Sequence, residues 1–482
     1  MRKRHILLSI SLLSLFFSAC TKGRIDDETP EIEPQDTISA DIIHGYFVRE
    51  LSREDFTHDQ FVENRKLYLG IMAGGNEYVD PIVESAASLS KSYLDYAFAS
   101  EQFSTPDESQ WKMRRITYSY RTVRYDGSPC ILSAEMWYPY SSSPAFTHTI
   151  ESVTSFSNIF WAKYNATYFP SIMAGRCYFN SLCITTDYEG MGIDTLHLHL
   201  TFAPDVLARQ QLDATLAALE FIDMEPDISL ADDYWTANIG MSRGGIASLA
   251  MARYLDNEAP QEIVDRIRLQ GSFCAVAPYV HEPLMDRFLE SDSTSFQCIH
   301  FIKLLLTEYY TAPDLFEGYD AQDLFSDEFL ALKDDEGRSL FDMVYKDVSD
   351  HRKLLEKLGT RTSRIINRDM LAPTGGLDKT NPKVKALIKA MERNNAVADW
   401  VPKHPVNLGG IRNDESIPAK CTETAYRTLK KAVFNSHSPV RITDTWLPDI
   451  VALGLDLGLE NHDFGTTIFT CIGIVTLKPW AN

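Results

Sequence analysis

The residues best suited to chemistry lie around Ser242, in the segment GMSRGG from 240 to 245, which follows the pattern G-x-S-x-G. A serine on a tight turn from a strand into a helix exposes its hydroxyl for nucleophilic attack, and flanking glycines let the backbone pass without Cβ clashes. The amide of Arg243 then lies at a helix N-terminus, where it donates to a developing oxyanion. We therefore expect Ser242 to be a nucleophile and Arg243 to supply one oxyanion contact.

The pattern also arises by chance, so its weight depends on the elements around it. An apolar strand is expected at 234–239 and a helix rich in Ala, Leu and Met at 245–254. Upstream, 115–123 and 131–138 alternate like strands on either side of a Y-D-G-S turn, which predicts a hairpin. Ser242 is thus expected to stand between a strand and a helix.

Further segments repeat this alternation of strand and helix along the chain. The expected strands are 149–154, 181–186, 272–276 and 406–409, and the expected helices are 205–222 and 419–432. Such alternation predicts an α/β fold with a mostly parallel sheet and crossover helices.

Between about 283 and 400 the rhythm of strands stops. Charged segments with helical spacing replace it, for example at 301–308, 349–358 and 383–393. We therefore expect one sheet domain that is interrupted by a helical insertion. No internal repeat of solenoid length is found, which weakens any repeat architecture.

Roughly residues 110–482 resemble the α/β-hydrolase superfamily, more narrowly its secreted lipase- and esterase-like members. The resemblance rests on the G-x-S-x-G segment and on ITTDYEGMG at 184–192, which looks like the family's D-Y-x-G-x-G stretch. It implies an α/β-hydrolase fold: a mostly parallel central sheet with flanking helices and a helical cap insertion. Asp187 precedes the serine in the chain and is expected to be a structural turn residue.

The resemblance also implies a catalytic triad in the chain order Ser, acid, His. The stretch PVNLGGIRNDESIP at 405–418 is similar to the family's acid loop and places Asp414 at the acid position. The loop has one extra residue and lacks the family's histidine, so Glu415 stays open as an alternative acid. Of the two histidines after Asp414, His462 stands in a polar loop as the family's base does, and His437 is the weaker candidate.

The family's second oxyanion donor is expected in the loop 154–158, with Ser155 as the candidate. His197 and His199 have an H-x-H spacing that metal sites also use, but no further ligand converges on them in the sequence. A structural role is therefore favoured, and neither a metal nor a cofactor is expected.

The N-terminus predicts export and lipidation. A positive RKR segment at 2–4 precedes an apolar run at 6–17, which is too short to span a membrane and is typical of a signal peptide. The run ends in FSAC, which resembles a lipobox and makes Cys20 the lipidated residue; ordinary signal cleavage beside an incidental cysteine is the alternative. Residues 20–40 are acidic and lack aromatics, as expected of a tether.

The composition excludes some partners. A net charge of -21 and a pI near 5.0 argue against nucleic acid and against direct contact with an anionic bilayer. Membrane attachment is therefore expected through the lipid anchor only, in the cell envelope and specifically at the outer membrane. The 44% hydrophobic content is that of a globular protein with a sizeable core.

These observations predict five regions and one function. The regions are a signal peptide at 1–19, a tether at 20–40, a helical N-terminal extension at 41–110, a core at 111–282 and 401–482, and a helical cap at 283–400. The expected function is serine hydrolysis of a carboxylic ester, from a small molecule, a lipid or an acylated glycan, through an acyl-enzyme. A serine peptidase with the same triad remains an alternative. So do a hydrolase fold without activity and a non-catalytic surface lipoprotein that captures glycans or other nutrients.

Overall fold

A computed structural model describes most of the expected core and insertion. The described residues are 45–57, 112–140, 145–154, 181–194, 197–226, 228–290, 295–333, 358–359 and 361–447, together with the single residues 337, 339, 341, 462 and 469. Cys20, Ser155, the tether and residues 349–357 of the expected helix 349–358 lie outside them.

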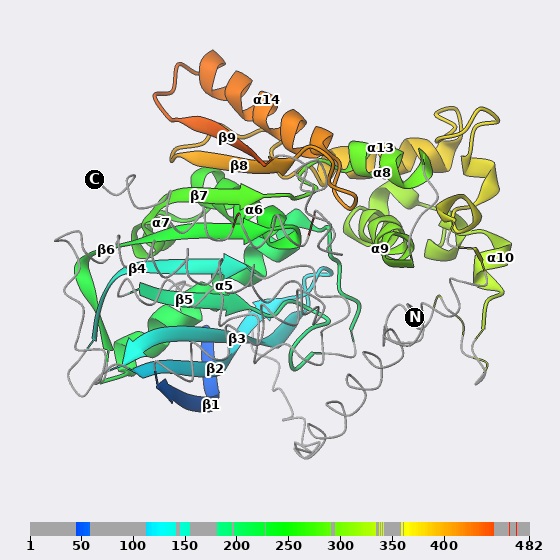
Figure 1. Ribbon diagram of the computed structural model, residues 1–482. Coiled ribbons are helices and arrows are strands. Elements are labelled where there is room, and N and C mark those ends of the chain that lie inside the picture. Colours follow the sequence, from blue (N-terminus) through cyan, green and yellow to red (C-terminus); the bar gives the residue numbers. More distant parts are fainter. Residues whose placement is uncertain are drawn as a thin grey trace, which may run out of the picture.

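Among these residues, nine strands form one sheet in the order β1-β2-β3-β5-β4-β6-β7-β8-β9 (Figure 1). The strands are β1 (Phe47–Thr57), β2 (Lys112–Val123), β3 (Pro129–Tyr140), β4 (Ala145–Thr154), β5 (Ser181–Thr186), β6 (Ile228–Met241), β7 (Leu269–Ala275), β8 (Val406–Ile411) and β9 (Ile442–Leu447). In this order, the neighbouring pairs from β5 and β4 onward to β8 and β9 are all parallel. The pairs β1–β2, β2–β3 and β3–β5 are antiparallel. The sheet is therefore mostly parallel, as expected.

Helices connect and cover these strands. They are α5 (Pro204–Met224), α6 (Arg243–Asn257), α7 (Gln261–Ile267), α8 (His281–Glu290), α9 (Ser295–Thr311), α10 (Asp327–Leu330), α13 (Pro382–Arg393) and α14 (Ala419–Asn435), with short 3-10 turns η3 (Pro313–Phe316), η4 (Ala321–Leu324), η5 (Thr362–Arg364) and η6 (Arg368–Met370). The apolar faces of α5 and α6 pack against the sheet, where Leu212, Leu216 and Met251 share a buried cluster with Tyr118 and Ile184. No helix in the described part is long and apolar enough to cross a membrane.

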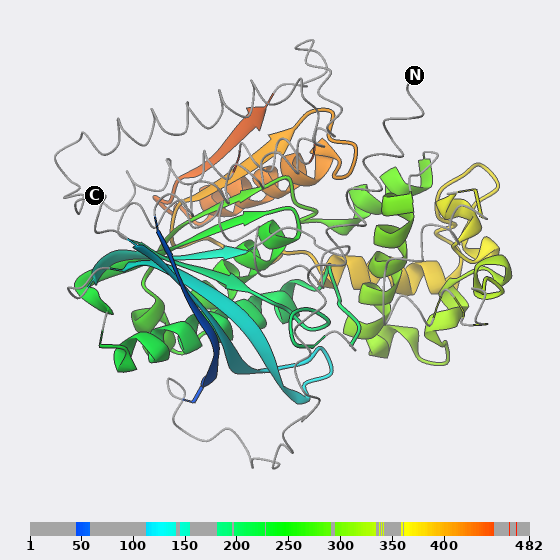
Figure 2. The ribbon, with the colours of Figure 1, turned by 60° about the horizontal axis from the view of Figure 1, so that its bottom comes forward.

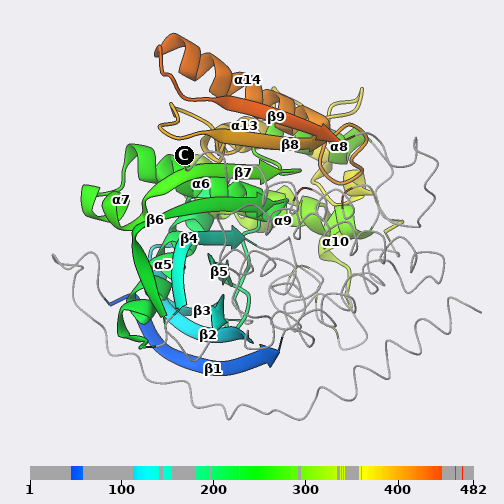
Figure 3. The same cartoon turned by 60° about the vertical axis from the view of Figure 1, so that its left-hand side comes forward.

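The expected elements of the core are confirmed. The hairpin is β2–β3, and the strand and helix around Ser242 are β6 and α6. The remaining expected strands and helices lie within β4, β5, β8, α5 and α14, and the expected strand 272–276 matches β7 except for its last residue. The strand β9 was not expected. It pairs with β8 as the last parallel strand, and the two edges of the sheet are seen together in Figure 3.

The expectation of a helical extension at 41–110 is wrong for Phe47–Thr57, which form the edge strand β1 (Figure 2). Pairing with β2 satisfies one side of the strand's backbone, and Phe47 packs 5.5 Å from Phe221 between ring centroids. Asp55 accepts from Arg114 of β2 at 2.7 Å. These long-range contacts override a local pattern without clear periodicity, as is common for edge strands. The rest of this extension lies outside the described residues.

The helices α8, α9, α10 and α13 belong to the insertion and gather beyond the carboxyl ends of the parallel strands (Figure 1). The expected helices 301–308 and 383–393 lie within α9 and α13. Ligand sites of parallel α/β sheets form at this end, so the insertion lies beside the place where Ser242 is expected.

Candidate active site

Ser242 occupies a strained turn between β6 and α6. Its backbone has φ 53° and ψ -126°, a conformation that costs free energy for a residue with a Cβ. The turn is held because the Ser242 amide donates to the carbonyl of Ala275 in β7 at 2.9 Å and the Ser242 carbonyl accepts from the Gly245 amide at 2.9 Å. Strain retained in this way is typical of functional positions.

The glycines of the turn are required by space. A Cβ on Gly240 would collide with the Gly244 carbonyl, and a Cβ on Gly245 would lie 2.6 Å from the Cβ of Ala277. The close approach of α6 to β6 and to the segment after β7 therefore depends on these two glycines. This is the steric reason for the spacing of the motif.

The structure brings Ser242, His462 and Asp414 together. The Ser242 Oγ lies 3.1 Å from His462 Nε2, and His462 Nδ1 lies 2.9 Å from Asp414 Oδ2. All three residues are buried, with exposed fractions of 4%, 6% and 7%. With the Nδ1 proton donated to Asp414, the His462 Nε2 carries a lone pair and can accept the Ser242 proton.

The other carboxyl oxygen of Asp414 fixes the orientation of its side chain. Asp414 Oδ1 accepts from the amides of Ser416 and Ile417 at 2.8 and 2.7 Å. One carboxylate oxygen therefore holds the Asp414 side chain to its loop, and the other contacts the imidazole. A residue that orients a histidine needs both contacts, because its own side chain must be fixed.

Glu415, the alternative acid, contacts the backbone of His462. Its Oε1 accepts from the His462 amide at 2.8 Å, and its own carbonyl accepts from Gln297 Nε2 of α9 at 2.7 Å. Burial raises the pKa of Glu415. Glu415 thus ties the His462 segment to the insertion, while Asp414 contacts the imidazole.

His437, the weaker candidate base, is exposed beyond the C-terminal end of α14. The N-terminal end of α14 follows the Asp414 loop, and its 17 residues extend about 25 Å along the helix axis. His437 is therefore far from Ser242.

Arg243 begins α6, and its side chain turns into the core. Its guanidinium lies over the Tyr188 ring at 5.1 Å, and Nη1 is 3.0 Å from the sulfur of Met191 and 2.8 Å from His199 Nε2. Burial lowers the pKa of Arg243 to about 10. Its amide stands at the helix N-terminus beside Ser242, where we expected an oxyanion donor.

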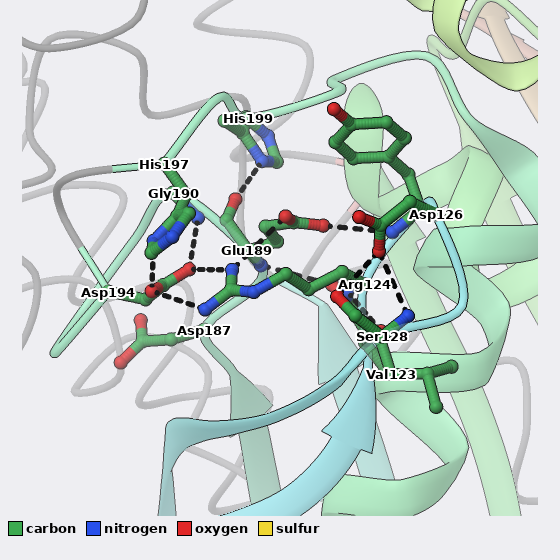
Figure 4. Close-up of polar contacts among 12 residues, drawn as sticks. Val123, Arg124, Asp126, Ser128, Asp187, Glu189, Gly190, Asp194, His197 and His199 are labelled. Atoms are coloured by element: carbon green, nitrogen blue, oxygen red, sulfur yellow. Dashed lines mark hydrogen bonds and ion pairs between the residues drawn. The ribbon is translucent and has the colours of Figure 1, made fainter.

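The loop after β5 is held by a network of ion pairs (Figure 4). Arg124 contacts Asp194 at 2.8 Å and Glu189 at 3.1 Å, and Asp194 also contacts His197 at 2.6 Å. His199 Nδ1 instead lies 2.8 Å from the Glu189 carbonyl. The two histidines of the H-x-H pair therefore have different partners, consistent with a structural role.

Asp187 is partly buried at the start of this loop. It accepts from the Ser133 hydroxyl at 2.6 Å, and burial raises its pKa to about 6. A Cβ on Gly192 would collide with this carboxylate and with Ser133, so Asp187 and a positive-φ glycine shape the loop together. This is the structural turn expected for Asp187.

A pocket opens at Ser242 and His462, and residues from both the core and the insertion line it. Its other lining residues are Thr201, Phe202, Arg243, Pro278, Phe288, Gln297, His300, Ser416 and Ile417. A wider surface hollow beside Trp235 and Arg268 lies near the start of β7, at the end opposite to Ala275 and Ser242. Among the described residues, no group of three or more His, Cys, Asp or Glu side chains is arranged to hold a metal ion.

The pocket residues of the insertion and of the loop at 201–202 were not expected from the sequence. One signal was available in α9, where Gln297, His300 and Lys303 recur every three residues and the residues between them are apolar. Polar side chains at that spacing share a side of a buried helix and point to a lined cavity.

Comparison with known proteins relates the fold to esterases. No protein-family model and no curated protein matches the sequence. Among solved structures, the rice cell wall degrading esterase LipA from Xanthomonas oryzae is similar with a TM-score of 0.57 at 15% identity, covering 89% of this chain and 97% of LipA. A putative hydrolase from Legionella pneumophila is similar with a TM-score of 0.57 at 16% identity, covering 90% of this chain and 98% of that one. The chain therefore has the fold of these esterase- and hydrolase-like proteins.

Proposed function

We propose that this protein is a serine hydrolase of the α/β-hydrolase type that cleaves a carboxylic ester, with Ser242 as nucleophile, His462 as base and Asp414 as the acid that orients it. The observation that carries the proposal is the pair of contacts from Ser242 Oγ to His462 Nε2 and from His462 Nδ1 to Asp414 Oδ2. The strained turn at Ser242 supports it, because it exposes the hydroxyl at the carboxyl end of a parallel strand.

The reaction proceeds in two acyl transfers. Ser242 Oγ attacks the ester carbonyl as its proton moves to His462 Nε2, and the Arg243 amide, with Ser155 as the second donor, stabilises the oxyanion. His462 then gives the proton to the leaving alcohol, and an acyl-enzyme remains. Water deprotonated by His462 releases the acid, and the proton returns to Ser242.

The insertion at 283–400 serves as a cap that shapes the substrate pocket. Phe288, Gln297 and His300 contribute to the pocket that contains Ser242. Residues in such a cap change the preference among esters more than they change the chemistry at the serine. The substrate is accordingly an ester of a small molecule, a lipid or an acylated glycan.

Labelling with a fluorophosphonate probe, together with turnover of a para-nitrophenyl ester, tests the proposal. Ser242→Ala should abolish both, because it removes the hydroxyl that lies 3.1 Å from His462 Nε2. Ser436→Ala is the matched control at an exposed position. Full activity in Ser242→Ala, or no labelling of the wild type, would refute the proposal and favour a binding lipoprotein.

A peptide amide assayed beside the ester distinguishes the peptidase alternative. The same three side chains cleave both bonds, so only relative rates decide. Turnover of the ester with a negligible rate on the amide is the expected result.

The lipid anchor at Cys20 and an outer-membrane location complete the proposal. They rest on the lipobox-like segment and on the acidic tether that follows it.

A further inference from the structure

The helix α9 carries polar side chains into an apolar setting beside the candidate site. From Cys298 to Glu308 the side chains are buried, and His300 and Lys303 among them retain 6% and 5% exposure. Both residues lie on the side of α9 that also carries Gln297. His300 and Gln297 line the pocket with Ser242, and Lys303 follows His300 by one turn.

Lys303 is a buried amine that has no counter-ion among the residues that the structure describes. No described carboxylate forms a hydrogen bond or an ion pair with it. Burial, with the nearby positive charge of Arg243, lowers the pKa of Lys303 to about 7. A buried ammonium that lacks a partner is costly, and natural proteins keep such a group chiefly where it has a task.

The surroundings of Lys303 are positive rather than negative. Arg243 from α6 and Lys303 both lower the pKa of His199, which burial already holds well below its usual value, so this imidazole stays neutral. Asp187 is the acidic group that acts on Arg243, and it is bound to Ser133. The positive charges of Arg243 and Lys303 therefore act on the same buried imidazole.

The Ser242 pocket itself contains an unsatisfied polar group. Thr201, two residues after His199, lines the pocket with Ser242, and its hydroxyl is buried without a hydrogen-bond partner in the described part of the chain. Phe202 stands edge-on to His300 of α9, with 6.0 Å between ring centroids, so the loop and the helix face one another here. A buried hydroxyl left unpaired costs free energy that a bound ligand can restore.

We propose that Lys303 and Thr201 form a carboxylate-binding subsite of the Ser242 pocket, so that the preferred ester carries a carboxylate near its scissile bond. This rests on the proposed function. An ammonium and a hydroxyl match the two oxygens of one carboxylate, and a charge-assisted hydrogen bond in a water-poor site is among the stronger polar contacts. The carboxylate supplies the counter-ion that Lys303 lacks.

Paired substrates test the preference and locate the charge. The acyl-side pair is para-nitrophenyl hemiglutarate against para-nitrophenyl valerate, and the alcohol-side pair is the acetyl ester of para-hydroxybenzoate against phenyl acetate. We expect kcat/KM of the wild type to favour the carboxylate member of one pair by about tenfold or more. A preference in either arm supports the subsite and names its side of the ester, and a preference in neither arm overturns it.

Lys303→Met should bring that ratio close to one. The matched control is Lys383→Met, in α13 of the same insertion, which should keep the wild-type ratio. Because Lys303→Met removes an uncompensated charge from the core, it should fold and have a melting temperature at least as high as the wild type. A marked fall in melting temperature would instead assign Lys303 a structural ion pair and refute the subsite.

Binding without turnover separates this inference from the proposed function. Calorimetry of glutarate and of para-hydroxybenzoate, against valerate and phenol, should show tighter binding of the carboxylate ligand of the favoured pair, with a loss of about tenfold in Lys303→Met. Tight carboxylate binding without esterase activity would keep the subsite and refute the hydrolase. Esterase activity that depends on Ser242 but lacks any carboxylate preference would keep the hydrolase and refute the subsite.

Discussion

Replacement of Asp414 by asparagine tests how the candidate triad works, since it changes charge and tautomer without changing size. In the protein, Asp414 Oδ1 accepts from the amides of Ser416 and Ile417, and Oδ2 faces His462 Nδ1. An asparagine keeps the two backbone contacts only if its carbonyl oxygen takes the Oδ1 place. Its NH2 group then faces His462 Nδ1.

That arrangement forces the wrong tautomer. An NH2 group donates, so Nδ1 must accept, and the imidazole proton moves to Nε2, which lies 3.1 Å from Ser242 Oγ. The Nε2 atom then has no lone pair with which to take the serine proton. A loss of kcat of up to about 10⁴-fold, or about 5 kcal/mol, is the expected size of such an effect.

Glu415→Gln is the matched control. The glutamine oxygen can still accept from the His462 amide, so kcat should change by less than about tenfold. Steady-state kinetics on an activated ester, with circular dichroism to verify folding, measure both variants. If Glu415→Gln collapses turnover while Asp414→Asn does not, the assignment of the acid is wrong. If neither has an effect, His462 works without this loop and the reasoning fails as a whole.

Three further predictions concern the turn, the Asp187 carboxyl group and the anchor. Gly240→Ala should destabilise the protein by about 2 kcal/mol or more in denaturant unfolding, because its Cβ would collide with the Gly244 carbonyl. In the control Gly318→Ala the Cβ meets no neighbour within 4 Å, so only the positive φ of 83° costs free energy, about 1 kcal/mol. In the folded protein the pKa of Asp187 is about 6, above the ordinary aspartate value of 3.8. The protonated carboxyl group therefore contributes stability that is lost as the pH rises through 6. The free energy of unfolding of Asp187→Asn, relative to that of the wild type, should therefore rise by about 1 kcal/mol from pH 5 to pH 8. A difference in stability that stays constant over this range would contradict the raised pKa of Asp187. Cys20→Ser should move the protein from the membrane fraction to the soluble fraction, and unchanged fractionation would exclude the lipid anchor.

Local patterns in the sequence were enough to predict the elements that position Ser242. The strand before it, the helix after it and the flanking glycines are short-range features, and α6 and β6 follow them. Asp414 and His462 were found through resemblance, because a loop carboxylate or histidine has no local signature of its own. Glu415 is the next residue after Asp414 and carries the same functional group, so the local sequence left it open as an alternative acid. The fold shows that Asp414 contacts the imidazole of His462 and Glu415 contacts its backbone amide.

The edge strand β1 shows the opposite case. Its backbone partner β2 lies more than fifty residues away, and its side-chain partner Phe221 is farther still, so no local period marks it as a strand. The polar residues of α9 are a similar case. The pocket that they line includes Thr201 and Phe202, from a loop far away in the sequence, and only the tertiary structure places this loop against α9.

The sequence by itself therefore determined the candidate nucleophile, the mostly parallel sheet and the helical insertion, because the spacing of nearby residues predicts each of them. Tertiary structure decided which carboxylate faces the imidazole and which side chains surround the serine. Those contacts join residues as far apart as Ser242 and His462, separated by 220 positions, and depend on how the sheet brings its loops to one edge.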